Sequence, residues 1–144
     1  MIASLRLIPI LLVALAAPLS AAPVFETVAA FETPPLTPIG GLVLHADGNY
    51  YGTTSDGGHY GLGTVFRISP AGDLTVIAHF TGTSGPAPGS APLTGLTIAA
   101  NGSLYGTTSA GGADDYGTVF KVTTTGVFTS LVSFTGSTGG AKGA

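Results

Sequence analysis

The residues best suited to acid–base or ligand chemistry in this sequence are its three histidines, His45, His59 and His79. An imidazole can exchange a proton near neutral pH or bind a metal ion. A catalytic role also needs a partner, and no carboxylate stands at a spacing that indicates a pair with any of the three. Proximity of His45 and His79 in the fold would change this interpretation. We therefore predict no catalytic residue and interpret the histidines as ordinary surface or core residues.

Acidic and amide side chains form a second group, which could supply oxygen ligands for calcium. They lie in three short segments, Asp47-Gly48-Asn49, Ser55-Asp56-Gly57 and Asp114-Asp115. Their spacing does not match an EF-hand, which places ligands at alternate positions and a Glu at the twelfth. Turn formation by Asp and Asn explains the same residues without a metal. We predict no cofactor, and calcium is the alternative.

Most of the remaining polar residues belong to an internal repeat with a period of 54 residues. The segment GNYYGTTSDGG (48–58) returns as GSLYGTTSAGG (102–112), and about 20 of 42 positions are identical between 41–82 and 95–136. A scaffold must repeat, whereas a single active site need not. The shared residues are therefore interpreted as structural.

The positions that differ between the two copies are the better candidates for recognition. Loops that vary on a constant frame are where binding residues concentrate. On this basis we predict contacts with a ligand or partner at six residues, Asp56, His59, Tyr60, Asp114, Asp115 and Tyr116.

Strands are the elements that must position these loops. The chain has 23 Gly and 10 Pro and only 8% charged residues, a turn-rich β composition. In the first copy, apolar alternation and Gly turns predict strands at 42–45, 50–55, 64–68 and 74–80. Alternation in the last strand places Leu74, Val76, Ala78 and Phe80 on one face, with Ile77 opposite. We predict an all-β, propeller-like repeat with four short antiparallel strands per unit of about 54 residues; a β-helix is the main rival.

The chain divides into four segments on this interpretation. Residues 1–22 have an early charge, an apolar run and small residues near the end, which is typical of a signal peptide cut after Ala22 or Ala21. A retained membrane anchor is the alternative. Residues 23–40 form a lead-in closing strand and a Pro-rich linker, followed by repeat unit 1 (41–94) and unit 2 (95–144). Two full units predict an incomplete propeller.

Charge and cysteine content narrow the partners and the location. The formal net charge is −3, so the sequence has no basic surface for nucleic acid. The absence of Cys excludes disulfides and thiolate metal sites. We expect a secreted, cell-surface or periplasmic protein with no membrane span after the signal peptide is removed.

The assembled motifs G-L, D-G-N, Y-G-T-T, G-G, G-T-V-F-[RK] and F-T-G resemble those of the GloVer tandem repeat of choice-of-anchor proteins. The resemblance covers about residues 24–144. It implies a propeller-like, exported bacterial protein at the cell surface. The sequence departs from longer relatives in having two full copies and no anchor, and the resemblance carries over no catalytic residues.

Together these features predict an exported module for binding or cell-surface architecture, with no catalytic activity of its own. The expected partners are an unidentified protein or glycan, together with further repeat units in the same chain or in a second copy. The alternatives are a propeller-type extracellular lyase or hydrolase, and a truncated fragment without independent function.

Overall fold

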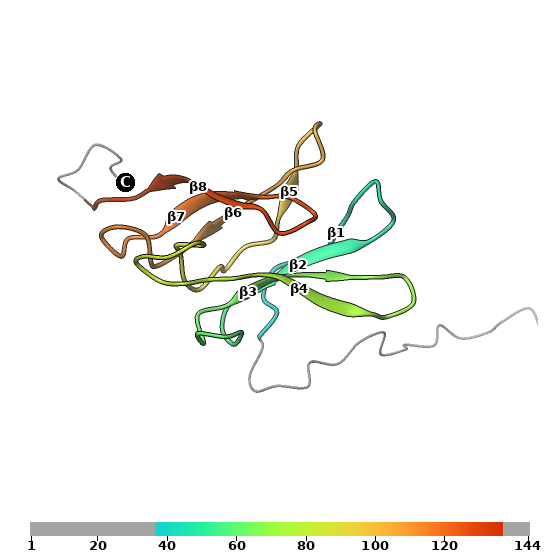
Figure 1. Ribbon diagram of the computed structural model, residues 1–144, viewed down its shortest axis with the longest axis horizontal. Coiled ribbons are helices and arrows are strands. Elements are labelled where there is room, and N and C mark those ends of the chain that lie inside the picture. Colours follow the sequence, from blue (N-terminus) through green and yellow to red (C-terminus); the bar gives the residue numbers. More distant parts are fainter. Residues whose placement is uncertain (1–36, 137–144) are drawn as a thin grey trace, which may run out of the picture.

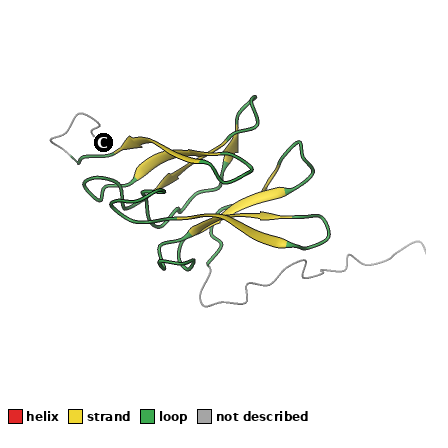
Figure 2. Cartoon of the chain, in the orientation of Figure 1, coloured by secondary structure: helices red, strands yellow, loops and turns green. Residues whose placement is uncertain are grey.

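A computed structural model describes residues 37–136 of the chain, which form two four-stranded antiparallel sheets (Figures 1 and 2). The first sheet, in the first unit, has the order β1 (Val43–Leu44), β2 (Tyr50–Thr54), β3 (Thr64–Ile68), β4 (Leu74–His79). The second repeats it with β5 (Thr97–Ile98), β6 (Leu104–Thr108), β7 (Thr118–Val122), β8 (Phe128–Ser133). Residues 37–136 contain no helix. The predicted all-β fold with four antiparallel strands in each propeller-like unit is confirmed, whereas the predicted signal peptide and the strand-like segment 24–31 lie outside the described residues.

Glycine allows an aromatic ring to lie across the middle of each sheet. Gly52 in β2 pairs directly with Phe66 in β3, and a Cβ atom on Gly52 would stand 2.6 Å from the Phe66 ring. Gly106 and Phe120 repeat the arrangement at 2.5 Å. Both glycines are therefore required because an aromatic side chain occupies the space of the missing Cβ.

The predicted alternation of residues 74–80 is wrong at its centre. The register between β3 and β4 pairs Phe66 with Val76 but Val65 with Ala78, so Ile77 is an extra residue in a β-bulge. Because a bulge shifts the side chains beyond it to the opposite face, Val76 and Ala78 lie on different faces of the sheet. The second unit has the same irregularity between Val119 and Phe120.

The register defines two faces on each sheet. The back face carries Tyr51, Thr53, Val65 and Ala78 in the first unit, and Tyr105, Thr107, Val119 and Val132 in the second. The front face carries Leu44, Tyr50, Phe66 and Ile68 in the first unit, and Ile98, Leu104, Phe120 and Val122 in the second.

The hydrophobic core lies between the two sheets. Tyr51, Val65 and Ala78 from the back face of the first unit cluster with Leu104, Phe120 and Val122 from the front face of the second. Phe80, which follows β4, is fully buried and makes edge-to-face contact with Phe120, with ring centroids 5.2 Å apart. The two units are therefore stacked through unlike faces and share one core.

Candidate functional site

The loop that differs most between the units borders a cavity of about 450 Å³ where the two units meet. His59 and Tyr60 line it from the loop after β2, and His79 lines it from the end of β4. Pro86 and Phe128 contribute from the linker between the units and from β8 of the second unit. Two of the six predicted contact residues, His59 and Tyr60, are thus brought together at a cavity, and both are exposed.

Two glycines aim this loop outward. Gly57 and Gly58 both have positive φ angles, 77° and 75°, which turn the chain sharply at the end of β2. The loop is closed by the Gly63 N–H, which donates to the carbonyl of Gly57 at 3.1 Å. The glycines therefore fix the base of the loop, and the side chains at its tip are free to vary.

His79 has a structural role in this site. Its Nδ1 accepts a hydrogen bond from the backbone N–H of His59 at 3.1 Å, and the two rings lie 6.4 Å apart. In the second unit the hydroxyl of Ser133 accepts the equivalent bond from the Ala113 N–H at 2.8 Å. This bond places the proton of a neutral His79 on Nε2. The contribution that is particular to the first unit is therefore the Nε2–H group and the exposed ring of His59.

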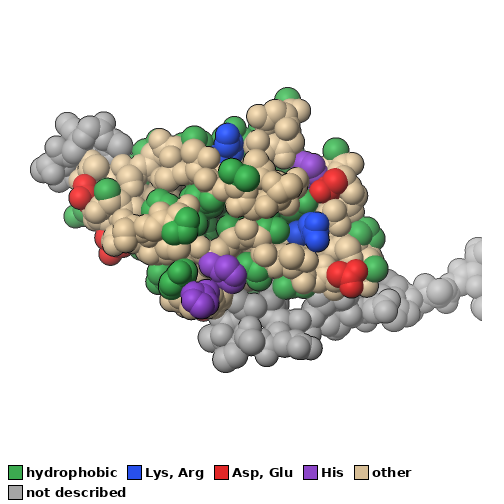
Figure 3. Space-filling model, in the orientation of Figure 1, with side chains coloured by type: hydrophobic (Ala, Val, Ile, Leu, Met, Phe, Trp, Pro, Cys, Tyr) green, Lys and Arg blue, Asp and Glu red, His purple; other side chains and the backbone are tan. Residues whose placement is uncertain are grey.

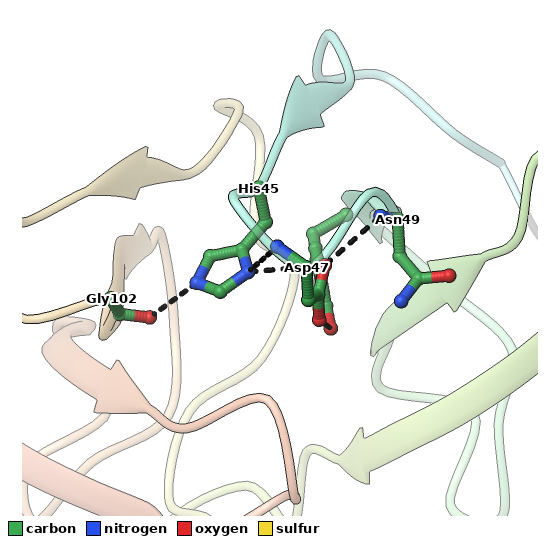
Figure 4. Close-up of polar contacts among 5 residues, drawn as sticks. His45, Asp47, Asn49 and Gly102 are labelled. Carbon is green, nitrogen blue, oxygen red and sulfur yellow. Dashed lines mark hydrogen bonds and ion pairs between the residues drawn. The ribbon is translucent and has the colours of Figure 1, made fainter.

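His45 takes part in a different contact, between turns of the two units (Figure 4). Its Nε2 lies 3.0 Å from the carbonyl oxygen of Gly102, and its Nδ1 accepts from the Asp47 N–H at 3.1 Å. The Asp47 carboxylate accepts from the Asn49 N–H at 2.9 Å and from the Tyr51 hydroxyl at 2.7 Å. His45 thus connects the two units, and the predicted alternative of a His45–His79 pair gives way to a His59–His79 pair.

The environment of this turn shifts two acid–base equilibria. Burial raises the pKa of Asp47, but hydrogen bonds from Asn49, Tyr51 and His45 outweigh it and hold the pKa well below its usual range. Burial raises the pKa of Tyr51 to about 12, helped by the hydrogen bond to Asp47 and the charge of that carboxylate, and opposed by Arg67. The pair is thus set as a carboxylate and a neutral phenol.

The other predicted contact residues lie away from the cavity lining. Asp56 accepts hydrogen bonds from the N–H and the hydroxyl of Thr37, each at 2.9 Å. Asp115 has a positive φ of 64° and accepts from the Gly111 N–H at 2.6 Å. Asp114 and Tyr116 are exposed in the same loop. Asp56 and Asp115 are therefore used to shape the chain.

The repeated G-T-T and G-T-V segments also have a structural explanation. The hydroxyls of Thr54 and Thr64 lie 2.8 Å apart across β2 and β3, and Thr108 and Thr118 repeat this contact at 2.9 Å. All four side chains are buried. A buried hydroxyl needs a partner, so a threonine on one strand requires one on the next.

Sequence reasoning missed His79, Pro86 and Phe128 as parts of this site. His79 faces the loop because it pairs with Thr64, the first residue of β3, immediately after the loop ends. The loss of symmetry at His79 and Ser133 was the available signal for it. Pro86 and Phe128 gave none, because they reach the cavity through the stacking of one unit on the next.

Metal and membrane features can be stated for the described part of the chain. Within residues 37–136, no three side chains from His, Cys, Asp or Glu are grouped so that they could hold a metal ion. None of the elements described there is a helix long and apolar enough to cross a membrane.

Two stacked units of four short antiparallel strands, with repeated turns and a shared core, define a propeller-like β-repeat protein. The family model described as the Gloeobacter/Verrucomicrobia repeat matches residues 19–144, so this chain belongs to that repeat family. The resemblance of its motifs to a tandem-repeat family is thereby confirmed. Comparison with curated proteins gave no match.

Proposed function

We propose that the protein is an exported, non-catalytic repeat module that binds an extracellular glycan or partner protein at the cavity beside His59 and Tyr60. One observation carries the proposal: the loop that differs between two otherwise similar units borders a cavity between them. Residues shared by the units are used by the strands, turns and core, so the frame places no demand on the variable side chains.

The lining of the cavity suggests the chemistry of the ligand. Among the residues that line it, none is Asp, Glu, Lys or Arg, and the rings of His59 and Tyr60 stand edge to face with centroids 4.7 Å apart. Charged side chains are also sparse on the face shown in Figure 3. An uncharged glycan suits such a surface, because sugar rings pack on aromatic side chains while histidine nitrogens reach their hydroxyls.

The role in export and cell-surface architecture is supported by the sequence of residues 1–22 and by family membership. We expect the secreted chain to begin at Pro23, or at Ala22 if the cut falls one residue earlier. N-terminal sequencing of the protein recovered from the medium or periplasm measures this directly.

The binding role is tested by giving the first unit the loop residues of the second. The double variant His59→Ala with Tyr60→Asp introduces the residues found at positions 113 and 114. We expect the unaltered chain to bind at least one polysaccharide in a panel of cellulose, chitin, xylan and peptidoglycan, and the variant to bind it about tenfold more weakly or worse. Calorimetry on soluble fragments of the polysaccharide gives the affinities.

The matched control is Asp114→Ala, which changes an exposed loop residue in the second unit and should leave the affinity unchanged. Equal binding by the unaltered chain and the double variant would rule out this site. If the unaltered chain released soluble sugar from any member of the panel, the alternative of a propeller-type hydrolase or lyase would replace the proposal.

A further inference from the structure

The contact between the two units is made by unlike faces, and each unit has a second face of the same kind that the other unit does not cover. Inside the chain, the back face of the first unit covers the front face of the second. The front face of the first unit and the back face of the second are the two remaining partners of that same interface. The molecule therefore carries both halves of one contact on its two ends.

Exposure follows this arrangement closely. Leu96 and Leu104 on the covered front face are 5% and 0% exposed, whereas their counterparts Leu42 and Tyr50 are 53% and 38% exposed. Leu44, at the same rim, is 60% exposed. A cavity of about 350 Å³ beside Leu42, Tyr50 and Ile68 marks space on this front face. Exposed apolar side chains beside a cavity are typical of an interaction surface.

The back faces show the same contrast in reverse. Tyr51, Thr53 and Val65 are buried in the first unit. The equivalent Tyr105 and Val119 are half-buried, and Thr107 is exposed. Ile77, the bulged residue of β4, packs against the core, whereas Leu131 at the matching position of β8 is 48% exposed.

We propose that a second copy of this chain docks here, its second unit placing its back face on the front face of the first unit. The internal interface is the template for this contact. Of the surfaces described, the back face of a second unit is the one whose shape and residues match an interface already present in the molecule. The contact is head-to-tail, so each copy keeps one free face at either end of the assembly.

Polar groups at the internal interface indicate which contacts the new one repeats. The Thr53 hydroxyl donates to the carbonyl of Thr94 in the other unit at 3.0 Å, and position 107 of one copy would donate to the carbonyl of Gly40 in the next. A Cβ atom on Gly126 would stand 2.5 Å from the Ile77 carbonyl, and Gly72 gives the same clearance to Leu131. The His45 contact to Gly102 is not repeated, because position 99 is Ala.

The test uses one charge on each face of the full secreted chain. Leu44→Glu blocks the front face of the first unit, and Leu131→Glu blocks the back face of the second. Both side chains are exposed in the single chain, so neither substitution removes a core contact. Sedimentation velocity over a range of concentrations is expected to show masses above one chain for the unaltered protein and the mass of one chain for either variant alone.

A mixture of the two variants makes the test specific. Leu44→Glu keeps its back face and Leu131→Glu keeps its front face, so a 1:1 mixture is expected to run at the mass of two chains and to stop there. A second pair, Leu42→Glu and Thr107→Glu, should behave in the same way, and circular dichroism confirms that each variant is folded. Tyr60→Glu is the control, because it places the same charge on an exposed ring away from both faces and should assemble like the unaltered chain.

Three results would overturn the proposal. A monomeric unaltered chain would leave the front face to residues before position 37 or to a further unit of a longer chain. Association that survives both variants would place the interface elsewhere. A dimer formed by one variant with itself, without need of the other, would show a symmetric contact. Glycan binding is measured separately at the His59 cavity, so either proposal can fail alone.

Discussion

The carboxylate of Asp47 shows how this protein uses its few charged residues. It accepts hydrogen bonds from the Asn49 N–H and from the Tyr51 hydroxyl, and so it holds a turn whose neighbour His45 contacts the second unit. Asp56 and Asp115 do similar work at the chain entry and in a loop. Residues that could have bound calcium are thus largely occupied by backbone donors.

The depressed pKa of Asp47 predicts how stability depends on pH. A carboxyl whose folded pKa is below its ordinary value of about 3.9 adds stability above that value, and the stability is lost as pH falls toward the folded pKa. We expect the urea midpoint of the unaltered chain to fall below about pH 4. Asp47→Asn, which copies Asn101 of the second unit, should show a smaller fall.

The control for this titration is Asp114→Asn, which removes the same charge from an exposed loop. It should keep the acid dependence of the unaltered chain. Equal acid dependence in Asp47→Asn and in the unaltered chain would show that the hydrogen bonds at this turn do not stabilise the ionised carboxyl.

At the scale of the elements, the sequence predicted the strands because their signals are local. Period-two alternation and Gly turns mark each strand, and the 64–68 prediction coincides with β3. The bulge at Ile77 could not be found in this way, because it depends on the register between β3 and β4. The same holds for the cavity: His59 and Tyr60 were visible as breaks in the repeat, whereas Phe128 reaches them only through stacking of the units.

The glycine in the middle of each second strand gives a prediction at this scale. Gly106→Ala would place a Cβ 2.5 Å from the Phe120 ring, which is fully buried and packed against Phe80 and Phe128. Because the ring has no space to move into, we expect a loss of about 1–3 kcal/mol in the free energy of unfolding. Urea denaturation measures this loss.

Gly41→Ala is the matched control for this substitution. A Cβ on Gly41 meets no atom within 4 Å, so its stability should stay unchanged or rise by about 0.4–1 kcal/mol. If Gly106→Ala were as stable as Gly41→Ala, the aromatic ring would not be what requires glycine in the strand.

At the scale of the whole molecule, the two units are joined by their core. The hydrophobic cluster takes side chains from both sheets, and the chain has no Cys, so no disulfide supplements this packing. Neither sheet, taken from the described residues, has a separate core of comparable size. The described units should therefore unfold together.

Phe80 is the residue that tests this coupling. It ends the last strand of the first unit, is fully buried, and contacts Phe120 and Phe128 of the second unit with ring centroids 5.2 and 5.8 Å away. Phe80→Ala should cost about 3–5 kcal/mol, a large part of the stability of a small domain. Val127→Ala, at an exposed position, should cost little.

Two probes then decide whether the loss is shared. Tyrosine fluorescence and far-ultraviolet circular dichroism should give one coincident urea transition in the unaltered chain, and Phe80→Ala should move both signals together to lower urea. A shared core requires this, because removing a ring that spans the interface destabilises both sheets at once. If one signal moved while part of the other kept its original midpoint, each unit would fold independently, and the stacked interface would contribute contact area without cooperativity.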